Sequence, residues 1–147
     1  MSWFMYVVAI ASGVANPVQS GTNAELNKQL GAPVWAGVAV YATGLAGLLL
    51  LQMFVRQAFP AAERMLAVSP WAWTGGLISI ASTMAGLTLA QRIGSGTFTG
   101  ITVTAALVSS VVLDQMGAIG FRQHTISPMR FAGCLLMVAG VWMISRF

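Results

Sequence analysis

The charged residues of this chain are few and widely spaced, and their spacing constrains the fold more than any other feature of the sequence. No charged residue lies between Lys28 and Arg56, between Arg64 and Arg92, or between Arg92 and Asp114. Each uncharged stretch has room for the run of about 20 mostly apolar residues with which a helix crosses a bilayer. Overall, 57% of residues are hydrophobic, 7% are charged, and the mean hydropathy is +0.80. A soluble domain of this size could not bury so much apolar surface, so the sequence predicts an integral membrane protein.

Five apolar segments, separated by charges, proline and glycine, are expected to form the helices of a single membrane domain over residues 1–147. The expected helices cover residues 3–29, 33–55, 70–91, 97–117 and 128–146. An alternative for the first segment is a cleaved secretory signal, because an apolar run precedes small residues before Asn16. The absence of positive charge before that run argues against this alternative. The expected fold class is therefore all-α, with five transmembrane helices per chain.

Several function classes find no support in the sequence. The net charge is +4, but the basic residues are scattered singly rather than clustered to follow phosphates, so we expect no nucleic-acid partner. The single cysteine, Cys134, lies in an apolar run and is expected to be a core residue, and His124 lies in a polar loop. No Cys/His cluster, nucleophile with a base, or Gly-rich phosphate loop occurs, so we expect no catalysis, metal or cofactor.

The first apolar segment carries an unusual load of polar side chains. At about 100° per residue, six of them fall on one stripe of a helix, namely Ser12, Asn16, Gln19, Ser20, Asn23 and Asn27. In hydrocarbon such groups need partners, so the stripe should face other helices or a watery cavity. Pro17 removes one backbone hydrogen bond within the stripe and is expected to kink the helix. These features favour substrate binding by Asn16, Gln19, Ser20 and Asn23; the alternative is that the polar groups only hold helices together.

Two aromatic residues in the next segments are further candidates for substrate contact. Tyr41 lies among small residues in the second segment and is expected to reach the cavity. Trp71 and Trp73 open the third segment, where tryptophan commonly anchors a helix at the membrane interface. Stacking of Trp73 on a ligand is the alternative to this anchoring role.

The three acidic residues differ in their expected roles. Glu25 lies on the helix face opposite the polar stripe with Lys28 three residues later, which favours an ion pair near the helix end. Glu63 lies beside Arg64 in a loop and should be solvated. Asp114, near the end of the fourth segment, is either a coupling acid that binds a proton or cation, or a partner for Arg122 or a neighbouring helix end.

The last segment has Gly133 and Gly140 seven residues apart and hence on one helix face, where they would let a partner helix approach closely. This pattern is similar to the G-x6-G dimerisation strip in the last helix of small multidrug resistance transporters. We therefore expect a dimer with Gly133 and Gly140 in its interface.

A broader resemblance covers essentially the whole chain. Residues 17–37, "PVQSGTNAELNKQLGAPVWAG", resemble the P-x-Q-x-x-x-N-x-x-L-x-x-x-L-G-x-P signature of the YdcZ-like family, five-helix members of the drug/metabolite transporter superfamily. The resemblance continues in "WTGG", "RIGSGTF", "LDQMG" and "SPMRFAGCLLMVAGV", in the family's order. By position, Pro17, Gln19 and Asn23 match its first-helix motif and Asp114 its fourth-helix acid. Ala106 stands where the family often has Gln, which puts substrate specificity in doubt.

This resemblance implies a half-size carrier in which two chains, identical or homologous, pack in opposite orientations to make ten helices. The expected function is secondary transport of a small polar molecule by alternating access in a bacterial-type inner membrane, without a cofactor. Two alternatives stay open: a small multidrug-type cation exporter, and a non-transporting membrane scaffold. The cation exporter requires an acid that faces the cavity, which neither Glu25 nor Asp114 provides by position.

The positive charges also predict insertion in both orientations. With five spans, the side of the second and fourth connections carries Arg56, Arg64, Arg122 and Arg130, and the opposite side carries Lys28, Arg92 and Arg146. Orientation follows an excess of Lys and Arg in short cytoplasmic loops, and four against three is almost no excess. A single gene product could then supply both members of an antiparallel homodimer.

Overall fold

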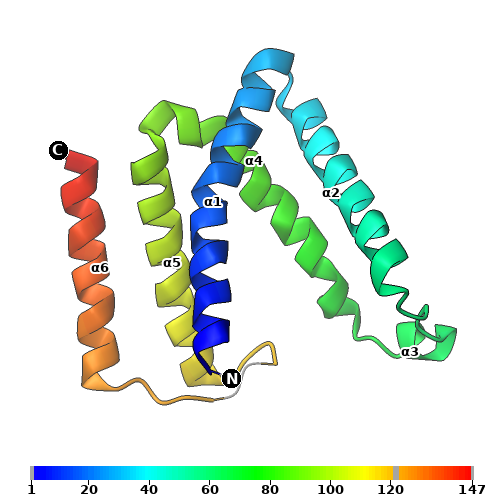
Figure 1. The fold of residues 1–147 in the computed structure, drawn as a ribbon. Helices are drawn as coiled ribbons and strands as arrows, with labels where there is room; N and C mark the ends of the chain where they lie inside the picture. The colour runs from blue at the N-terminus through cyan, green and yellow to red at the C-terminus, as the bar shows by residue number, and fades with distance from the viewer. Residues whose placement is uncertain (1, 121–122, 147) are drawn as a thin grey trace. The chain divides into compact units, whose positions relative to one another are not determined.

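All of the secondary structure in the computed structural model, which describes residues 2–120 and 123–146, is helical (Figure 1). In chain order the elements are α1 (Ser2–Leu30), α2 (Pro33–Val55), α3 (Ala62–Leu66), the 3-10 helix η1 (Pro70–Thr74), α4 (Gly75–Ile93), α5 (Ser95–Met116) and α6 (Pro128–Arg146).

The third apolar segment and the loop before it differ in detail from the expectation. The expected helix over 70–91 is a 3-10 turn followed by an α-helix that continues to Ile93. The loop over 56–69 contains the short helix α3, whose residues are mostly good helix formers. Glu63 lies in its first turn and Arg64 in its last turn, where each charge complements the helix dipole.

Glycines mark two helix boundaries. Gly94, with φ +87°, separates α4 from α5, and Gly117, with φ +58°, ends α5. Both lie in the left-handed region, which glycine adopts without a steric penalty. The expected helix over 97–117 therefore starts earlier, at Ser95, and ends at Met116 because Gly117 is its cap.

Four helical segments of the described chain are long and apolar enough to cross a membrane: Pro33–Val55, Pro70–Ile93, Ser95–Met116 and Pro128–Arg146. Helix α1 is not among them, although its 29 residues would extend about 43 Å at about 1.5 Å per residue. Its polar stripe lowers its hydropathy. The expected fifth span therefore stays a prediction.

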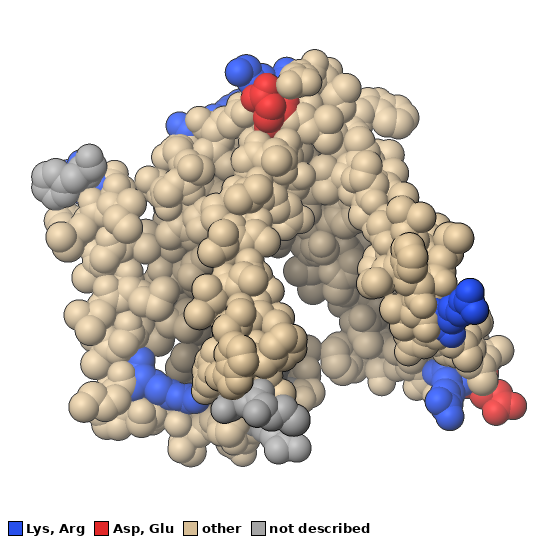
Figure 2. All heavy atoms as spheres, viewed as in Figure 1, with Lys and Arg blue, Asp and Glu red and all other residues tan. Residues whose placement is uncertain are grey.

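The charged side chains of the described residues lie in loops or within about two turns of a helix end, at about 3.6 residues per turn. The atoms of each long helix between its charged ends belong to uncharged residues (Figure 2). This distribution is the one that a bilayer requires, because a charge in the hydrocarbon core is costly.

The chain divides into two compact units, one made of Met1–Pro17 and Ile93–Phe147, the other of Val18–Arg92. In the first unit, α5 and α6 pack side by side (Figure 1). A Cβ atom on Gly100 would lie 3.2 Å from Val141 Cγ2, so the missing side chain allows this close approach. Small residues thus set the distance between α5 and α6.

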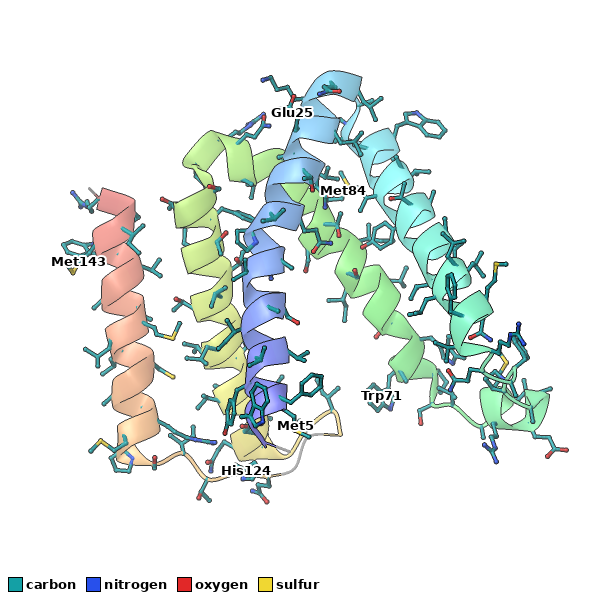
Figure 3. All side chains as sticks on the ribbon, viewed as in Figure 1. Met5, Glu25, Trp71, Met84, His124 and Met143 are labelled. Carbon is teal, nitrogen blue, oxygen red and sulfur yellow. The ribbon has the colours of Figure 1, made fainter. Side chains whose placement is uncertain are left out.

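The second unit contains the end of α1 together with α2, α3, η1 and α4. Small residues again bring its helices together: a Cβ atom on Gly37 would lie 3.3 Å from Met84 Sδ and 3.7 Å from Leu87 Cδ1. Figure 3 labels Met84 on α4, near the crossing of α1 and α4. The buried residues of this unit are Ser20, Ala24, Ala36, Gly37, Gly86, Leu87 and Ala90.

Candidate functional site

The polar stripe of α1 changes its surroundings along the helix. Ser12, Asn16 and Gln19 are exposed, Asn23 and Asn27 are half-buried, and Ser20 is buried. The helix continues through Pro17. The stripe therefore enters the packed part of the second unit only from Ser20 onward.

Asn27 supports the interpretation that the stripe holds helices together. Its Nδ2 donates a hydrogen bond of 2.8 Å to the carbonyl oxygen of Leu87 on α4. Its Oδ1 is buried and, within the described part of the chain, accepts no hydrogen bond. Asn27 thus joins α1 to α4 and leaves one acceptor unsatisfied.

The other three amides of the stripe behave differently. Among the residues that the structure describes, the side chains of Asn16, Gln19 and Asn23 form no hydrogen bond. An amide left unpaired in hydrocarbon is costly. These three side chains therefore need a partner other than those that the described residues supply, such as water, a solute or a second protein chain.

Tyr41 on α2 joins a hydroxyl cluster with two residues of α4. The Tyr41 hydroxyl lies 2.7 Å from Ser79 Oγ and 3.0 Å from Thr83 Oγ1. Sequence analysis singled out Tyr41 but missed Ser79 and Thr83. Their four-residue spacing, which places two hydroxyls on one face of an apolar helix, was the available signal.

The buried residues of the second unit gather at one end of its helices. In α2 they are Ala36 and Gly37, near the turn from α1, and in α4 they are Gly86, Leu87 and Ala90, near its C-terminal end. From Tyr41 to Val55, by contrast, every residue of α2 is exposed. The hydroxyl cluster lies at the boundary between this packed end and the exposed remainder.

Trp73 lies in η1, at the start of the α4 segment, and is 59% exposed. It is six residues from Ser79, or about 9 Å along a helix at about 1.5 Å per residue. Neighbouring Trp71 is also exposed and is labelled at the same end of the segment in Figure 3. This position favours the interfacial anchor over a role in stacking on a ligand.

The ion pair expected for Glu25 is confirmed. Glu25 Oε2 lies 3.8 Å from Lys28 Nζ, and both side chains are largely exposed. Glu25 Oε1 also accepts a 3.0 Å hydrogen bond from Gln29 Nε2. The carboxylate is therefore occupied by residues of its own helix end.

Glu25→Gln is expected to leave most transport activity and stability unchanged, because an exposed ion pair contributes only about 0–1 kcal/mol. The measurement is the initial uptake rate and melting temperature of reconstituted variant and wild-type protein. Complete loss of uptake at normal expression would show that this carboxylate takes part in transport.

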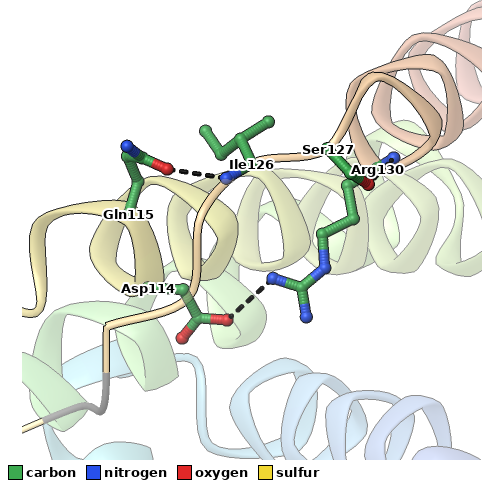
Figure 4. Close-up of polar contacts among 5 residues, drawn as sticks. All are labelled: Asp114, Gln115, Ile126, Ser127 and Arg130. Carbon is green, nitrogen blue, oxygen red and sulfur yellow. Dashed lines mark hydrogen bonds and ion pairs between the residues drawn. The ribbon is translucent and has the colours of Figure 1, made fainter.

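Asp114 and Gln115, at the end of α5, form polar contacts with the start of α6 and with the loop before it (Figure 4). Its Oδ2 lies 3.6 Å from Arg130 Nη1, and its backbone oxygen accepts a 2.8 Å bond from the His124 N–H. The adjacent Gln115 Oε1 accepts a 2.6 Å bond from the Ile126 N–H. The contact with Arg130 agrees with the interpretation in which Asp114 holds a neighbouring helix end, and its role as a coupling acid stays a prediction; Arg122 lies outside the described residues. No group of three His, Cys, Asp or Glu side chains suited to a metal ion occurs within residues 2–120 and 123–146.

Gly133 and Gly140 on α6 are half-buried, but neither has a close neighbour among the described residues at the place of a side chain. A Cβ atom added at either glycine would meet no atom within 4 Å in the described structure, in contrast to Gly100 on the facing helix α5. Cys134, beside this strip, is half-buried.

Comparison with known proteins identifies the family. Residues 4–143 match the model of the family described as "Putative inner membrane exporter, YdcZ". The chain belongs to this family. No curated protein and no solved structure matches it.

Membership of the YdcZ family agrees with the resemblance seen in the sequence motifs. The family is a class of membrane exporters rather than of enzymes. Together with the apolar helices, it makes this chain a membrane transporter and a multi-pass protein of the inner membrane.

Proposed function

We propose that this YdcZ-family chain is a secondary transporter that moves a small polar molecule by alternating access, as a dimer of two oppositely oriented copies. The observation that carries the proposal is the row of amides Asn16, Gln19 and Asn23, for which the described part of the chain supplies no hydrogen-bond partner. In a carrier, such amides meet water and solute in turn.

Positions of the polar groups along their helices support the proposal, because they agree with the depth at which many secondary carriers bind their substrates. Counted from the α1–α2 turn, Gln19 lies about 16 Å along α1 and Tyr41 about 12 Å along α2, at about 1.5 Å per residue. Thr83 lies about 15 Å along α4 from Ile93, by the same rise. The hydrocarbon core is about 30 Å thick. Distances of this size would put these groups near the midplane of a bilayer, where inverted-repeat carriers bind solute.

In this proposal, the packed end of the second unit would close the solute path on the membrane side where α1 turns into α2. Ala36, Gly37 and Leu87 fill this end, whereas α2 beyond Tyr41 is exposed. The two compact units are connected at Pro17 within α1 and at Arg92 before Gly94. A proline and a glycine at these connections would ease the movement of one unit against the other.

In the proposed dimer, the partner chain would also cover polar side chains of α1, which would let α1 cross the bilayer as a fifth span. The polar stripe of α1 would face the partner chain and the solute path, and its apolar residues, such as Val14 and Val18, would face lipid. Gly133 and Gly140 on α6 offer a flat strip for a partner helix.

Gly133→Leu combined with Gly140→Leu is expected to weaken the dimer while the single chain stays folded, because no described atom occupies the space near either glycine. Gly100→Leu is the matched control: it crowds Val141 and should destabilise the chain itself by about 1–3 kcal/mol. Crosslinking and thermal unfolding in detergent measure the two effects. An unchanged crosslinked dimer in the double variant would place the interface elsewhere.

Dual orientation is the direct test of the proposed assembly. Reporter enzymes that are active only in the cytoplasm or only outside it, fused to Phe147, should both give signal in a native-like host. A chain that gives signal with only one reporter would contradict the antiparallel homodimer and favour a parallel assembly or a homologous partner chain.

Membership of an exporter family disfavours a non-transporting scaffold, although the hydrogen bond from Asn27 to Leu87 does join two helices. Solute-dependent thermal stabilisation of purified protein would favour the transporter, and its absence across a broad solute screen would favour the scaffold. The cation exporter has less support, because Asp114 and Glu25 are each paired with a basic side chain.

A further inference from the structure

We infer that Tyr41, Ser79 and Thr83 form a solute-binding site for an uncharged group that accepts hydrogen bonds, such as a hydroxyl or carbonyl oxygen. This inference rests on the proposed transport function and specifies the chemistry of its substrate.

The first step is a count of the hydrogen-bond donors that the three hydroxyl groups supply. Each of the three hydroxyls has one O–H donor, and the cluster has two contacts, at 2.7 Å and 3.0 Å. One donor is therefore left without an acceptor inside the cluster. Within residues 2–120 and 123–146, none of the three hydroxyls makes another hydrogen bond.

The second step is the position of the cluster. Asn27 and Leu87 are in contact, and one helical turn earlier on each helix come Asn23 and Thr83. Because the Asn27–Leu87 contact fixes their register, Asn23 and Thr83 lie at a similar level just beyond the packed end of the unit. Tyr41 is 38% exposed there, so the cluster is not sealed off by the packed end of the unit.

The third step is the absence of charge. No Lys, Arg, Asp or Glu lies in α2, or in α4 before Arg92. A net charge on the solute would therefore lose its hydration without gaining a counter-charge. A spare hydroxyl donor at the level of the unpaired amide of Asn23 suits an uncharged polar molecule better than a cation or an anion.

Thiol reactivity in membrane vesicles tests this inference without knowledge of the natural solute. Thr83→Cys and Ser79→Cys are placed in a Cys134→Ser background and treated with 2-hydroxyethyl methanethiosulfonate or its trimethylammonium-ethyl analogue. The thiolate attacks the sulfenyl sulfur and methanesulfinate leaves, so the rate reports access of water and reagent. Ser69→Cys, in the exposed loop, gives the reference ratio of the two rates, and Leu48→Cys, on the exposed apolar face of α2, is the lipid-facing control.

The thiols at 79 and 83 should react and the thiol at 48 should not. The measured quantity is the rate with the neutral reagent divided by the rate with the cationic reagent. This ratio should be roughly tenfold higher at positions 79 and 83 than at position 69, because the cation loses hydration there. An equal or greater preference for the cation would overturn the inference. So would unreactive thiols at 79 and 83 combined with a reactive Gln19→Cys, a result that leaves the proposed transport function intact. Unreactive thiols at 19, 79 and 83 together would overturn both.

Discussion

Gln19→Leu is expected to abolish solute transport and leave the folded dimer intact. Gln19 is exposed and its amide makes no hydrogen bond among the described residues, so leucine of similar size removes a solute contact without removing a helix contact. Asn23→Leu should have the same effect, since Asn23 is half-buried but equally unpaired. The initial rate should fall by at least about tenfold, the effect of losing roughly 1.4 kcal/mol of solute interaction.

The measurement is uptake into proteoliposomes of a solute identified with wild-type protein, together with crosslinking and thermal unfolding of each variant. Val18→Leu is the matched control, because Val18 lies on the opposite, apolar side of α1 and is 61% exposed. It should transport like wild type. Unfolding or loss of the dimer in both Gln19→Leu and Asn23→Leu would instead show that the amides hold helices together, as Asn27 does.

Charge-biased variants are expected to be inactive alone and active together. Gln57→Lys with Ser69→Lys changes the balance of positive residues from four against three to six against three. Gln91→Lys and Ser145→Lys with Arg64→Ala reverses it to three against five. Because short-loop Lys and Arg set orientation, each variant should insert one way only and find no inverted partner.

Uptake by cells that express one variant, the other, or both measures this effect, with the reporter fusions confirming orientation. Co-expression should restore most of the wild-type rate, because the two variants then supply both orientations. A matched control replaces the same positions by Gln or Asn, without new charge, and should stay active. Full activity of one biased variant alone, in a single orientation, would contradict the antiparallel dimer.

The candidate site could be predicted from the sequence only in part. The angular position of Asn16, Gln19 and Asn23 follows from helix geometry, which depends on spacing along one segment. The sequence also pointed to Tyr41, but not to Ser79 and Thr83, because serine and threonine are common in membrane helices and usually bond within their own helix. Thr43 and Thr102 do so here.

By itself, the sequence determined the helical, membrane-embedded class of this protein, the placement of its charges at helix ends and the Glu25–Lys28 pair. Each of these depends on apolar length or on neighbours within one helix turn. Only the tertiary structure decided that Asn27 bonds Leu87, that Tyr41 meets two hydroxyls of α4, and that Asp114 pairs with Arg130. These contacts join residues far apart in the chain, on pairs of helices that small residues such as Gly37 and Gly100 allow to approach. The spacing of residues within one helix carries no information about which side chain of another helix lies opposite.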